Sequence, residues 1–266
     1  MATNSAIVVH PVPAFQDNYL WVIHNGSHAA VVDPGDAAPV LDYLRVNRLQ
    51  LAAVICTHHH LDHVGGVEKI LDTLQLRGKI PVYGPATERI PARTQALREG
   101  DCITVPFLDL TFGVLDVPGH TAGHIAYVGH GLLFCGDTLF ACGCGRLFEG
   151  TPEQMTASLA KLKALPPQTK VFCAHEYTMA NIKFAEAVEP GNADLKLRKA
   201  FCAAKRHRNL PTVPSTIHLE LATNPFLRWD QAAVKAAAAV RLNRDIGQNP
   251  APALVFGAIR EWKNNF

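Results

Sequence analysis

The sequence predicts an α/β domain followed by a helical domain. The main evidence is a change near residue 175 from strand-like to helix-like sequence patterns. Before it, short apolar or β-branched runs alternate with Gly, Pro and Asp, as in strands joined by turns. After it, Ala-rich charged stretches have the spacing of amphipathic helices. We therefore predict one domain over residues 1–175 and a second over residues 176–266, a division that a chain of 266 residues can support.

The predicted elements follow from these patterns in chain order. Strands are expected at residues 7–9, 19–23, 29–32, 51–56, 110–117, 125–128, 132–135 and 170–174. Helices are expected at residues 39–46, 67–76, 152–165, 181–188, 195–206 and 231–241. Thr151 and Pro152 open one of these helices with a capping residue and a proline in the first turn. Residues 211–225 carry prolines at both ends and are predicted to form a loop.

Composition limits the classes of protein and of partner. Apolar residues make up 48% of the chain and charged residues 18%, which is typical of a soluble globular protein. The formal charge of +2 gives no reason to expect nucleic acid or a membrane surface as a partner. The start at Met1–Ser5 has no signal-peptide pattern, and no apolar run approaches a membrane span. Seven cysteines, several inside apolar runs, favour reduced thiols and a cytoplasmic location.

The densest group of metal-ligand side chains lies in the segment Thr57–His63. It places four histidines and one aspartate within six residues, directly after a predicted strand and before a Gly-Gly pair. Imidazole nitrogens and carboxylate oxygens are ligands that zinc, iron and manganese accept. His58 and His60 are two residues apart, so an extended backbone points both to one side, where they can bind one ion. Asp62 and His63 are adjacent at the expected start of a helix and can serve a second ion.

Four further side chains of the same kind follow predicted strands elsewhere in the chain. They are Asp33, His120, Asp137 and His175. Each alone is as well explained as a turn residue or as a buried histidine with satisfied hydrogen bonds. Because loops at strand ends present functional groups from a rigid scaffold, the four together with residues 57–63 favour a metal site. Cys142 and Cys144 are better explained as small residues of a tight glycine-rich loop than as a redox pair.

The motif Thr-His-x-His-x-Asp-His at residues 57–63, followed in order by Gly-His, Gly-Asp and a terminal His, resembles the metallo-β-lactamase superfamily. The resemblance implies an αββα sandwich of two mixed sheets with helices outside and a dinuclear metal site at one edge. It assigns His58, His60 and His120 to one ion, and Asp62, His63 and His175 to the other, with Asp137 bridging them. Asp33 is then expected to orient a ligand without binding metal itself. The two ions are expected to be zinc, with iron or manganese as alternatives.

A narrower resemblance, to the glyoxalase II (hydroxyacylglutathione hydrolase) family, covers essentially the whole chain. It rests on residues 15–19 (FQDNY), 136–151 (GDTLFACGCGRLFEGT), 174–178 (AHEYT) and 259–263 (IREWK). It implies that glutathione is bound by Arg146, Tyr177, Arg260 and Lys263. Some family members have Lys and Tyr where this chain has Arg146 and Phe148. Arg146 keeps the positive charge and can bind a carboxylate through two hydrogen bonds, whereas Phe148 lacks the hydroxyl.

The activity implied is hydrolysis of S-(2-hydroxyacyl)glutathione, chiefly S-D-lactoylglutathione, to D-lactate and glutathione, which removes methylglyoxal. The seven metal ligands would be the catalytic residues. A hydroxide bridging the two ions would attack the thioester carbonyl, since metal binding lowers the pKa of water from about 15.7 to about 7. A thiolate with a parent pKa of about 8.5 leaves without a strong general acid. We expect a monomer whose partner is this small-molecule substrate.

Two other functions fit parts of the sequence. A glutathione persulfide dioxygenase shares the motif at residues 57–63 but uses a single iron, and the cations Arg260 and Lys263 argue against it. A non-catalytic metal-binding module would bind metal without turnover, but structural zinc sites are usually rich in cysteine. Without the family resemblance, the two C-terminal cations are better explained as the solvated face of a helix. The sequence assigns no role to His59, His124 or Phe148.

Overall fold

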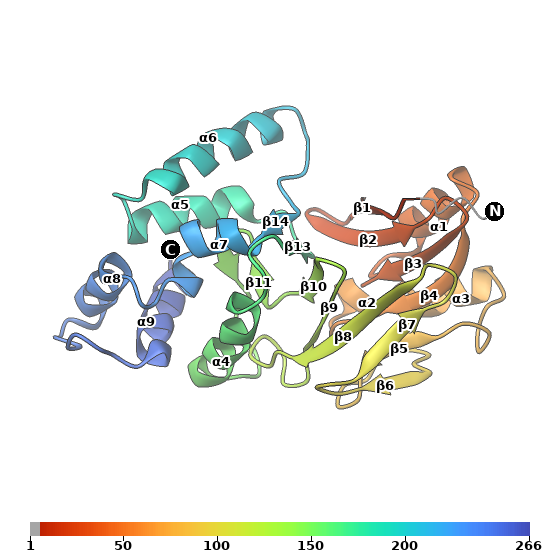
Figure 1. Cartoon of the computed structure of the whole chain (residues 1–266), viewed down its shortest axis with the longest axis horizontal. Coiled ribbons are helices and arrows are strands. Elements are labelled where there is room, and N and C mark those ends of the chain that lie inside the picture. The colour runs from red at the N-terminus through yellow and green to blue at the C-terminus, as the bar shows by residue number, and fades with distance from the viewer. Residues whose placement is uncertain (1–5) are drawn as a thin grey trace. The chain divides into compact units, whose positions relative to one another are not determined.

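A computed structural model describes residues 6–266 (Figure 1). The segment Met1–Ser5, for which the sequence predicts no signal peptide, lies outside the described residues. Contacts along the chain divide it into two units, and each is described by itself. The first unit extends to Asp116 and adds Gly123–Gly136, and the second contains Val117–Ala122 and Asp137–Phe266.

A mixed sheet forms one part of the first unit, with its strands in sequence order from β1 to β6. The strands are β1 (Val8–Ala14), β2 (Asn18–His24), β3 (His28–Val32), β4 (Gln50–Ile55), β5 (Val82–Pro85) and β6 (Gln95–Leu97). The pairs β1–β2 and β2–β3 are antiparallel, and the later pairs are parallel. Parallel neighbours need crossover connections, which here contain the helices α1 (Ala37–Val46), α2 (Leu61–Val64) and α3 (Val67–Thr73).

A second group of strands in the first unit is an antiparallel meander. Its members are β7 (Cys102–Val105), β8 (Leu110–Asp116), β9 (Ile125–Gly129) and β10 (Leu132–Gly136). Strands β9 and β10 are joined by the two-residue loop His130–Gly131, and both residues have positive φ, at 53° and 73°. A loop of two such residues matches the twist of the strands that it connects.

The core of the first unit explains why the strand predictions around residues 19–56 agree with the structure. Strands β2, β3 and β4 are buried along almost their whole length, so they read as continuous apolar runs. Val22, Val31 and Val54 are fully buried and belong to one cluster with Val40 of α1 and Ile70 of α3. This packing fixes the end of β4, from which the segment Thr57–His63 departs.

The second unit is mainly helical (Figure 1). Its helices are α4 (Pro152–Lys163), α5 (Thr178–Val188), α6 (Ala193–His207), α7 (Ile217–Thr223), the 3-10 helix η1 (Pro225–Leu227), α8 (Ala232–Leu242) and α9 (Pro252–Asn264). Its strands are the short pairs β11 (Leu139–Phe140) with β12 (Gly143–Cys144), and β13 (Lys170–Cys173) with β14 (Ser215–Thr216). The predicted cap of α4 is confirmed, because Thr151 and Gln154 form a reciprocal capping box.

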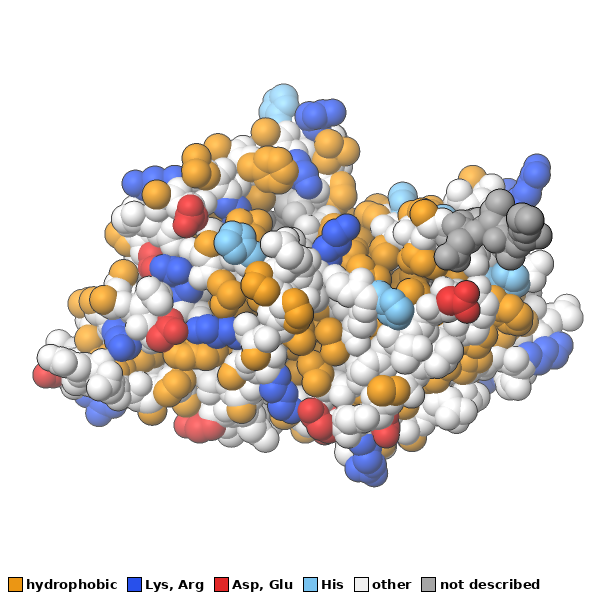
Figure 2. All heavy atoms as spheres, in the orientation of Figure 1, with side chains coloured by type: hydrophobic (Ala, Val, Ile, Leu, Met, Phe, Trp, Pro, Cys, Tyr) orange, Lys and Arg blue, Asp and Glu red, His pale blue; other side chains and the backbone are white. Residues whose placement is uncertain are grey.

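Helix α9 packs against α8 and α4, and aromatic side chains complete this part of the core. Phe184 of α5 contacts Trp262 and Phe266 edge to face, with ring centroids 5.2 and 5.3 Å apart. Helix α6 instead keeps Leu197 and Phe201 exposed, and Figure 2 shows hydrophobic and basic side chains together over this helix. The α9 packing places the last segment of the chain next to the loops of the second unit.

The structure corrects the prediction of a loop over residues 211–225. Residues 215–216 form β14, and Thr216 then caps α7 by accepting a hydrogen bond from the Leu219 amide. The helix has seven residues between prolines, which is too short for a periodic pattern to be recognised. Strands β5 to β7 and helix α9 were also not among the predicted elements. Among the described helices, none combines the length and the apolar character that crossing a bilayer requires.

Candidate metal centre and substrate pocket

The segment Thr57–His63 takes its shape from the end of β4 and the short helix α2. The Cys56 amide donates to Tyr83 O at 2.9 Å, and Thr57 O accepts from the Ile125 amide at 3.0 Å. His60 is the N-cap of α2, so the next residues wind into a turn. A Cβ on Gly35 would lie 1.8 Å from the Asp62 carbonyl oxygen, so only glycine allows this close approach.

Asp33 orients the segment through both of its carboxylate oxygens. Oδ1 accepts a hydrogen bond from the Thr57 amide at 2.7 Å, and Oδ2 accepts one from the Thr57 hydroxyl at 2.7 Å. Oδ2 also lies 3.1 Å from Nδ1 of His63. The Asp33 backbone is left-handed, with φ of 50°, which turns the chain sharply after β3. Because its oxygens are engaged in this way, Asp33 holds the ring of His63 and leaves its other nitrogen for a ligand.

The donor atoms of the first unit converge in pairs. Nε2 of His58 lies 3.1 Å from Nδ1 of His60, and Nε2 of His63 lies 3.5 Å from Oδ2 of Asp62. The Asn18 amide nitrogen donates to the same Asp62 oxygen at 3.0 Å. Asn18 belongs to the FQDNY segment, for which the sequence predicts no role, and the structure shows that it positions Asp62.

Asp137 gathers the donors of the second unit. Its Oδ2 lies 3.4 Å from Nε2 of His120, and its Oδ1 lies 3.3 Å from Nε2 of His175. Nδ1 of His120 is 2.9 Å from the carbonyl oxygen of Arg146, which orients the ring. One carboxylate thus presents a different oxygen to each of two imidazoles, an arrangement suited to bridging two ions.

These distances fit a divalent metal. A tetrahedral ion with bonds of about 2.0–2.1 Å separates its ligand atoms by about 3.3 Å. The donor pairs within each unit lie between 3.1 and 3.5 Å apart. His58 and His63 in the first unit, and His120, Asp137 and His175 in the second, are buried, so the donor atoms within each unit lie in a setting poor in water. The donor set of imidazoles and carboxylates suits zinc, iron or manganese.

The residues without an assigned role support the ligands from outside. Nδ1 of His59 lies 3.0 Å from Oε2 of Glu88, and its ring lies edge to face against His60 with centroids 5.0 Å apart. His124 stacks on His58 with ring centroids 4.5 Å apart. In the second unit, Phe148 contacts the edge of His120 at 5.2 Å and is largely exposed.

A cavity of about 430 Å³ opens in the second unit beside these donors. Its wall contains two candidate metal ligands and all four predicted glutathione-binding side chains: His120, Asp137, Arg146, Tyr177, Arg260 and Lys263. Tyr177 stacks on His175 with centroids 4.7 Å apart and an angle of 5° between the rings. The wall also contains Phe140 and Asn181, which the sequence did not single out.

The cations of the cavity are held by the protein backbone and by aromatic rings. Nη1 of Arg260 donates to the Cys144 carbonyl at 3.0 Å, and the guanidinium lies 5.1 Å from the Phe226 ring centroid. Lys263 donates to Oδ1 of Asn181. Burial, together with the neighbouring Arg260, lowers the pKa of Lys263 to about 8. Arg260 is buried and Lys263 is partly buried, and cations held out of water are costly without a counter-charge, so the cavity favours an anionic ligand.

The family comparisons divide the chain at residue 175. Residues 14–175 match the model of the metallo-beta-lactamase superfamily, and residues 176–266 match the model described as hydroxyacylglutathione hydrolase C-terminus. Because relatives named hydroxyacylglutathione hydrolase are 53% and 57% identical over nearly the whole chain, it belongs to the hydroxyacylglutathione hydrolase family. The predicted fold class, a metallo-β-lactamase-type α/β domain followed by a helical domain, is thereby confirmed.

Relatives in this family match along the full length. The hydroxyacylglutathione hydrolase of Cupriavidus taiwanensis is 57% identical and covers 97% of this chain and 98% of its own. That of Nitrosomonas eutropha is 53% identical, covering 98% of this chain and 99% of its own. The crystal structure of TTHA1623 in a di-iron-bound form is 26% identical with a TM-score of 0.58, covering 82% of this chain and all (100%) of that chain. The fold and the His/Asp donor set together support binding of a divalent metal.

Proposed function

We propose that this chain hydrolyses S-(2-hydroxyacyl)glutathione thioesters, chiefly S-D-lactoylglutathione, to D-lactate and glutathione. The observation that carries this proposal is the cavity of the second unit, whose wall combines metal-ligand side chains with three cations. A substrate that reaches both must have a group to be hydrolysed and a part rich in negative charge. Glutathione carries two carboxylates and one amine, so it can supply the negative charge that the three cations would bind. The relatives of this chain are named hydroxyacylglutathione hydrolase, which agrees with a glutathione thioester as substrate.

Two divalent ions are proposed as the cofactors. His58, His60 and His120 would hold one ion, Asp62, His63 and His175 the other, and Asp137 would contact both. Zinc is the proposed metal, and the same donors accept iron or manganese; TTHA1623 has been described in a di-iron-bound form. When bound, such ions polarise a carbonyl and supply a nucleophilic hydroxide at neutral pH.

The side chains of the second unit would then bind and orient the substrate. Arg146, Arg260 and Lys263 are the proposed partners of the glutathione carboxylates, and charge-assisted hydrogen bonds make such contacts strong. Arg260 is already fixed by the Cys144 carbonyl, so little side-chain freedom is lost when the ligand binds. Tyr177, stacked on His175, would line the path between the tripeptide and the thioester. A thiolate leaving group needs no strong general acid.

The remaining expectations extend this proposal. Residues 1–175 are proposed as the metal-binding catalytic domain, and residues 176–266 as the domain that supplies most of the glutathione contacts. The protein is proposed to act as a monomer in the cytoplasm on a small-molecule substrate, without nucleic-acid or membrane partners. The low net charge supports the absence of nucleic-acid and membrane partners, and the reduced state expected of the cysteines supports the cytoplasmic location.

The proposal is tested by the turnover of S-D-lactoylglutathione by the purified protein, followed as loss of the thioester, with metal content measured on the same sample. We expect rapid hydrolysis and close to two divalent ions per chain. Absence of hydrolysis in protein that contains metal would contradict the assignment. Oxygen-dependent turnover of glutathione persulfide with one iron per chain would instead support a dioxygenase.

A further inference from the structure

The segment Phe140–Cys144 forms a tight hairpin in the wall of the cavity. Strands β11 and β12 are two residues each, and the residue Cys142 between them has a left-handed backbone with φ of 55°. Two residue pairs give such a hairpin little stability of its own. Both Phe140 and Cys144 line the cavity, so the shape of this segment decides where the glutathione-binding groups stand.

Side chains from three other parts of the unit bind the backbone of this hairpin. Asn224 Nδ2 lies 3.1 Å from the Phe140 carbonyl and 2.9 Å from the Gly143 carbonyl. Asn181 Nδ2 donates to Ala141 O at 2.9 Å. The Cys142 amide donates to Oε2 of Glu220 at 2.9 Å. Every residue from 140 to 144 therefore has a backbone group bonded to a side chain, the last being the contact between Cys144 and Arg260.

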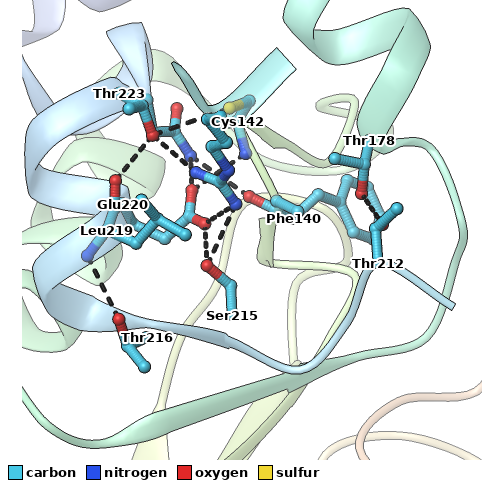
Figure 3. A network of polar contacts seen from close by, with 12 residues as sticks. Phe140, Cys142, Thr178, Thr212, Ser215, Thr216, Leu219, Glu220 and Thr223 are labelled. Carbon is cyan, nitrogen blue, oxygen red and sulfur yellow. Dashed lines mark hydrogen bonds and ion pairs between the residues drawn. The ribbon is translucent and has the colours of Figure 1, made fainter. Parts of the chain in front are cut away.

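Glu220 is the fully buried centre of this arrangement. Figure 3 shows Cys142, Ser215 and Thr223 gathered round it. Its Oε1 accepts from Nη2 of Arg198 at 2.5 Å and from the Ser215 hydroxyl, while Oε2 accepts from the Cys142 amide and from Asn224 Nδ2, each at 2.9 Å. One oxygen thus faces α6 and β14, and the other faces the hairpin and Asn224. A carboxylate that accepts on both sides ties the hairpin rigidly to the helices.

The hairpin in turn holds the cations of the cavity. Its Cys144 carbonyl accepts from Arg260 at 3.0 Å. Its Gly143 packs so closely on Asn181 that a Cβ would lie 2.5 Å from Asn181 Nδ2. Asn181 is the acceptor for the Lys263 ammonium. A shift of the hairpin would therefore move Arg260 and Lys263 together.

We propose that Asn224 and Glu220 are positioning residues for glutathione recognition, acting through the Phe140–Cys144 hairpin on Arg260 and Lys263. This inference rests on the proposed function, because it assigns the two cations to the substrate. Neither positioning residue lines the cavity. Their effect is expected chiefly on the binding of the tripeptide, because the hairpin is hydrogen-bonded to Arg260 and, through Asn181, linked to Lys263. Its contact with a candidate metal donor is the edge-to-face packing of Phe140 on His175.

The test compares Asn224→Ala with Ser215→Ala. The first removes the donor that binds two hairpin carbonyls, whereas the second removes a contact to the same Glu220 carboxylate on the side away from the hairpin. Both replace one buried polar side chain, so a general loss of stability should be shared. Asn224→Asp is the second variant, because it keeps the Oδ1 acceptor for the Phe226 amide and loses the donor.

Three quantities are measured for each protein: KM and kcat for S-D-lactoylglutathione, the Kd of glutathione by calorimetry, and metal content. Because a misplacement of about 1 Å can cost on the order of 100-fold, we expect both Asn224 variants to raise KM and Kd about tenfold. Metal content should be unchanged, and Ser215→Ala should stay within about twofold of wild type.

The results that would contradict the proposed function differ from those that would contradict the positioning role. If the wild-type protein neither binds glutathione nor hydrolyses the thioester, the proposed function is wrong and the inference falls with it. If the wild-type protein does both, and either Asn224 variant keeps the wild-type KM and Kd, the positioning role is refuted. Equal losses in Asn224→Ala and Ser215→Ala would also refute it, because they would reflect a general effect on the core.

Discussion

The two units build their shares of the candidate site in different ways. In the first unit, four donors lie within six residues; Asp33 holds Thr57 and the ring of His63, and Asn18 holds Asp62. In the second, the donors come from three separate segments: Asp137 lies against the rings of His120 and His175, and the Arg146 carbonyl lies against His120. The placement of the donors in the first unit follows from local chain geometry. The placement of the donors in the second unit depends on the packing of the whole helical unit.

The largest effect is expected from Asp137→Ala, which removes the group that gathers the donors of the second unit. Each Asp137 oxygen faces one imidazole, so its loss should release metal and lower kcat/KM by more than about 100-fold, the upper range for the loss of a supporting partner. Metal analysis and steady-state kinetics measure both. Retention of two ions per chain would rule out the bridging role.

An intermediate effect is expected from Asp33→Asn in the first unit. The amide keeps the size of the side chain but presents a donor or a weaker acceptor to Thr57 and His63, so we expect metal affinity to fall about 10–100-fold. Competition with a chelator measures this change. Asp36→Asn is the matched control, because Asp36 only caps α1 by accepting from the Ala38 amide. Equal metal affinity in Asp33→Asn and wild type would contradict the orienting role.

The smallest effect concerns the charge of Lys263. Its pKa is lowered to about 8, chiefly by burial, so the ammonium loses its proton as pH rises through about 8. A lost charge-assisted hydrogen bond costs about 1.5–3 kcal/mol, so kcat/KM for S-D-lactoylglutathione should fall about tenfold or more between pH 7 and pH 9. This ratio reports groups of the free enzyme.

Lys263→Arg separates this effect from other titrations. Arginine stays charged over the whole range, so the variant should lose the decline that centres near pH 8. An identical pH profile in both proteins would show that the charge of Lys263 does not contribute to substrate binding.

The same contrast explains what the sequence could predict. The segment Thr57–His63 identifies its donors because their spacing alone brings them together, and β2 to β4 were recognisable because buried strands read as apolar runs. The roles of Asn18 and Asn181 could not be predicted, because a single asparagine carries no periodic signal. Helix α7 could not be predicted either, because its seven residues between prolines are too few for a periodic pattern. Its formation depends on tertiary packing and on the Thr216 cap.

The glutathione-binding residues of the second unit were predicted from family motifs, because their local sequence pattern carries little information. Arg260 and Lys263 lie three positions apart on α9, which by itself also fits a solvated helix face. The structure instead buries Arg260 against Cys144 and lowers the pKa of Lys263, and neither fact follows from spacing. Long-range packing supplies the information that the local sequence lacks.

The role of the cations in binding glutathione is tested by comparing two thioesters of D-lactate as substrates of the wild-type protein. One is the glutathione thioester and the other is the N-acetylcysteamine thioester. Both present the same acyl group and a thiolate leaving group, but only the first has carboxylates for Arg146, Arg260 and Lys263. We predict that kcat/KM for the glutathione thioester is higher by about 100-fold or more, as expected for charge-assisted contacts. Equal kcat/KM values for the two thioesters would contradict it.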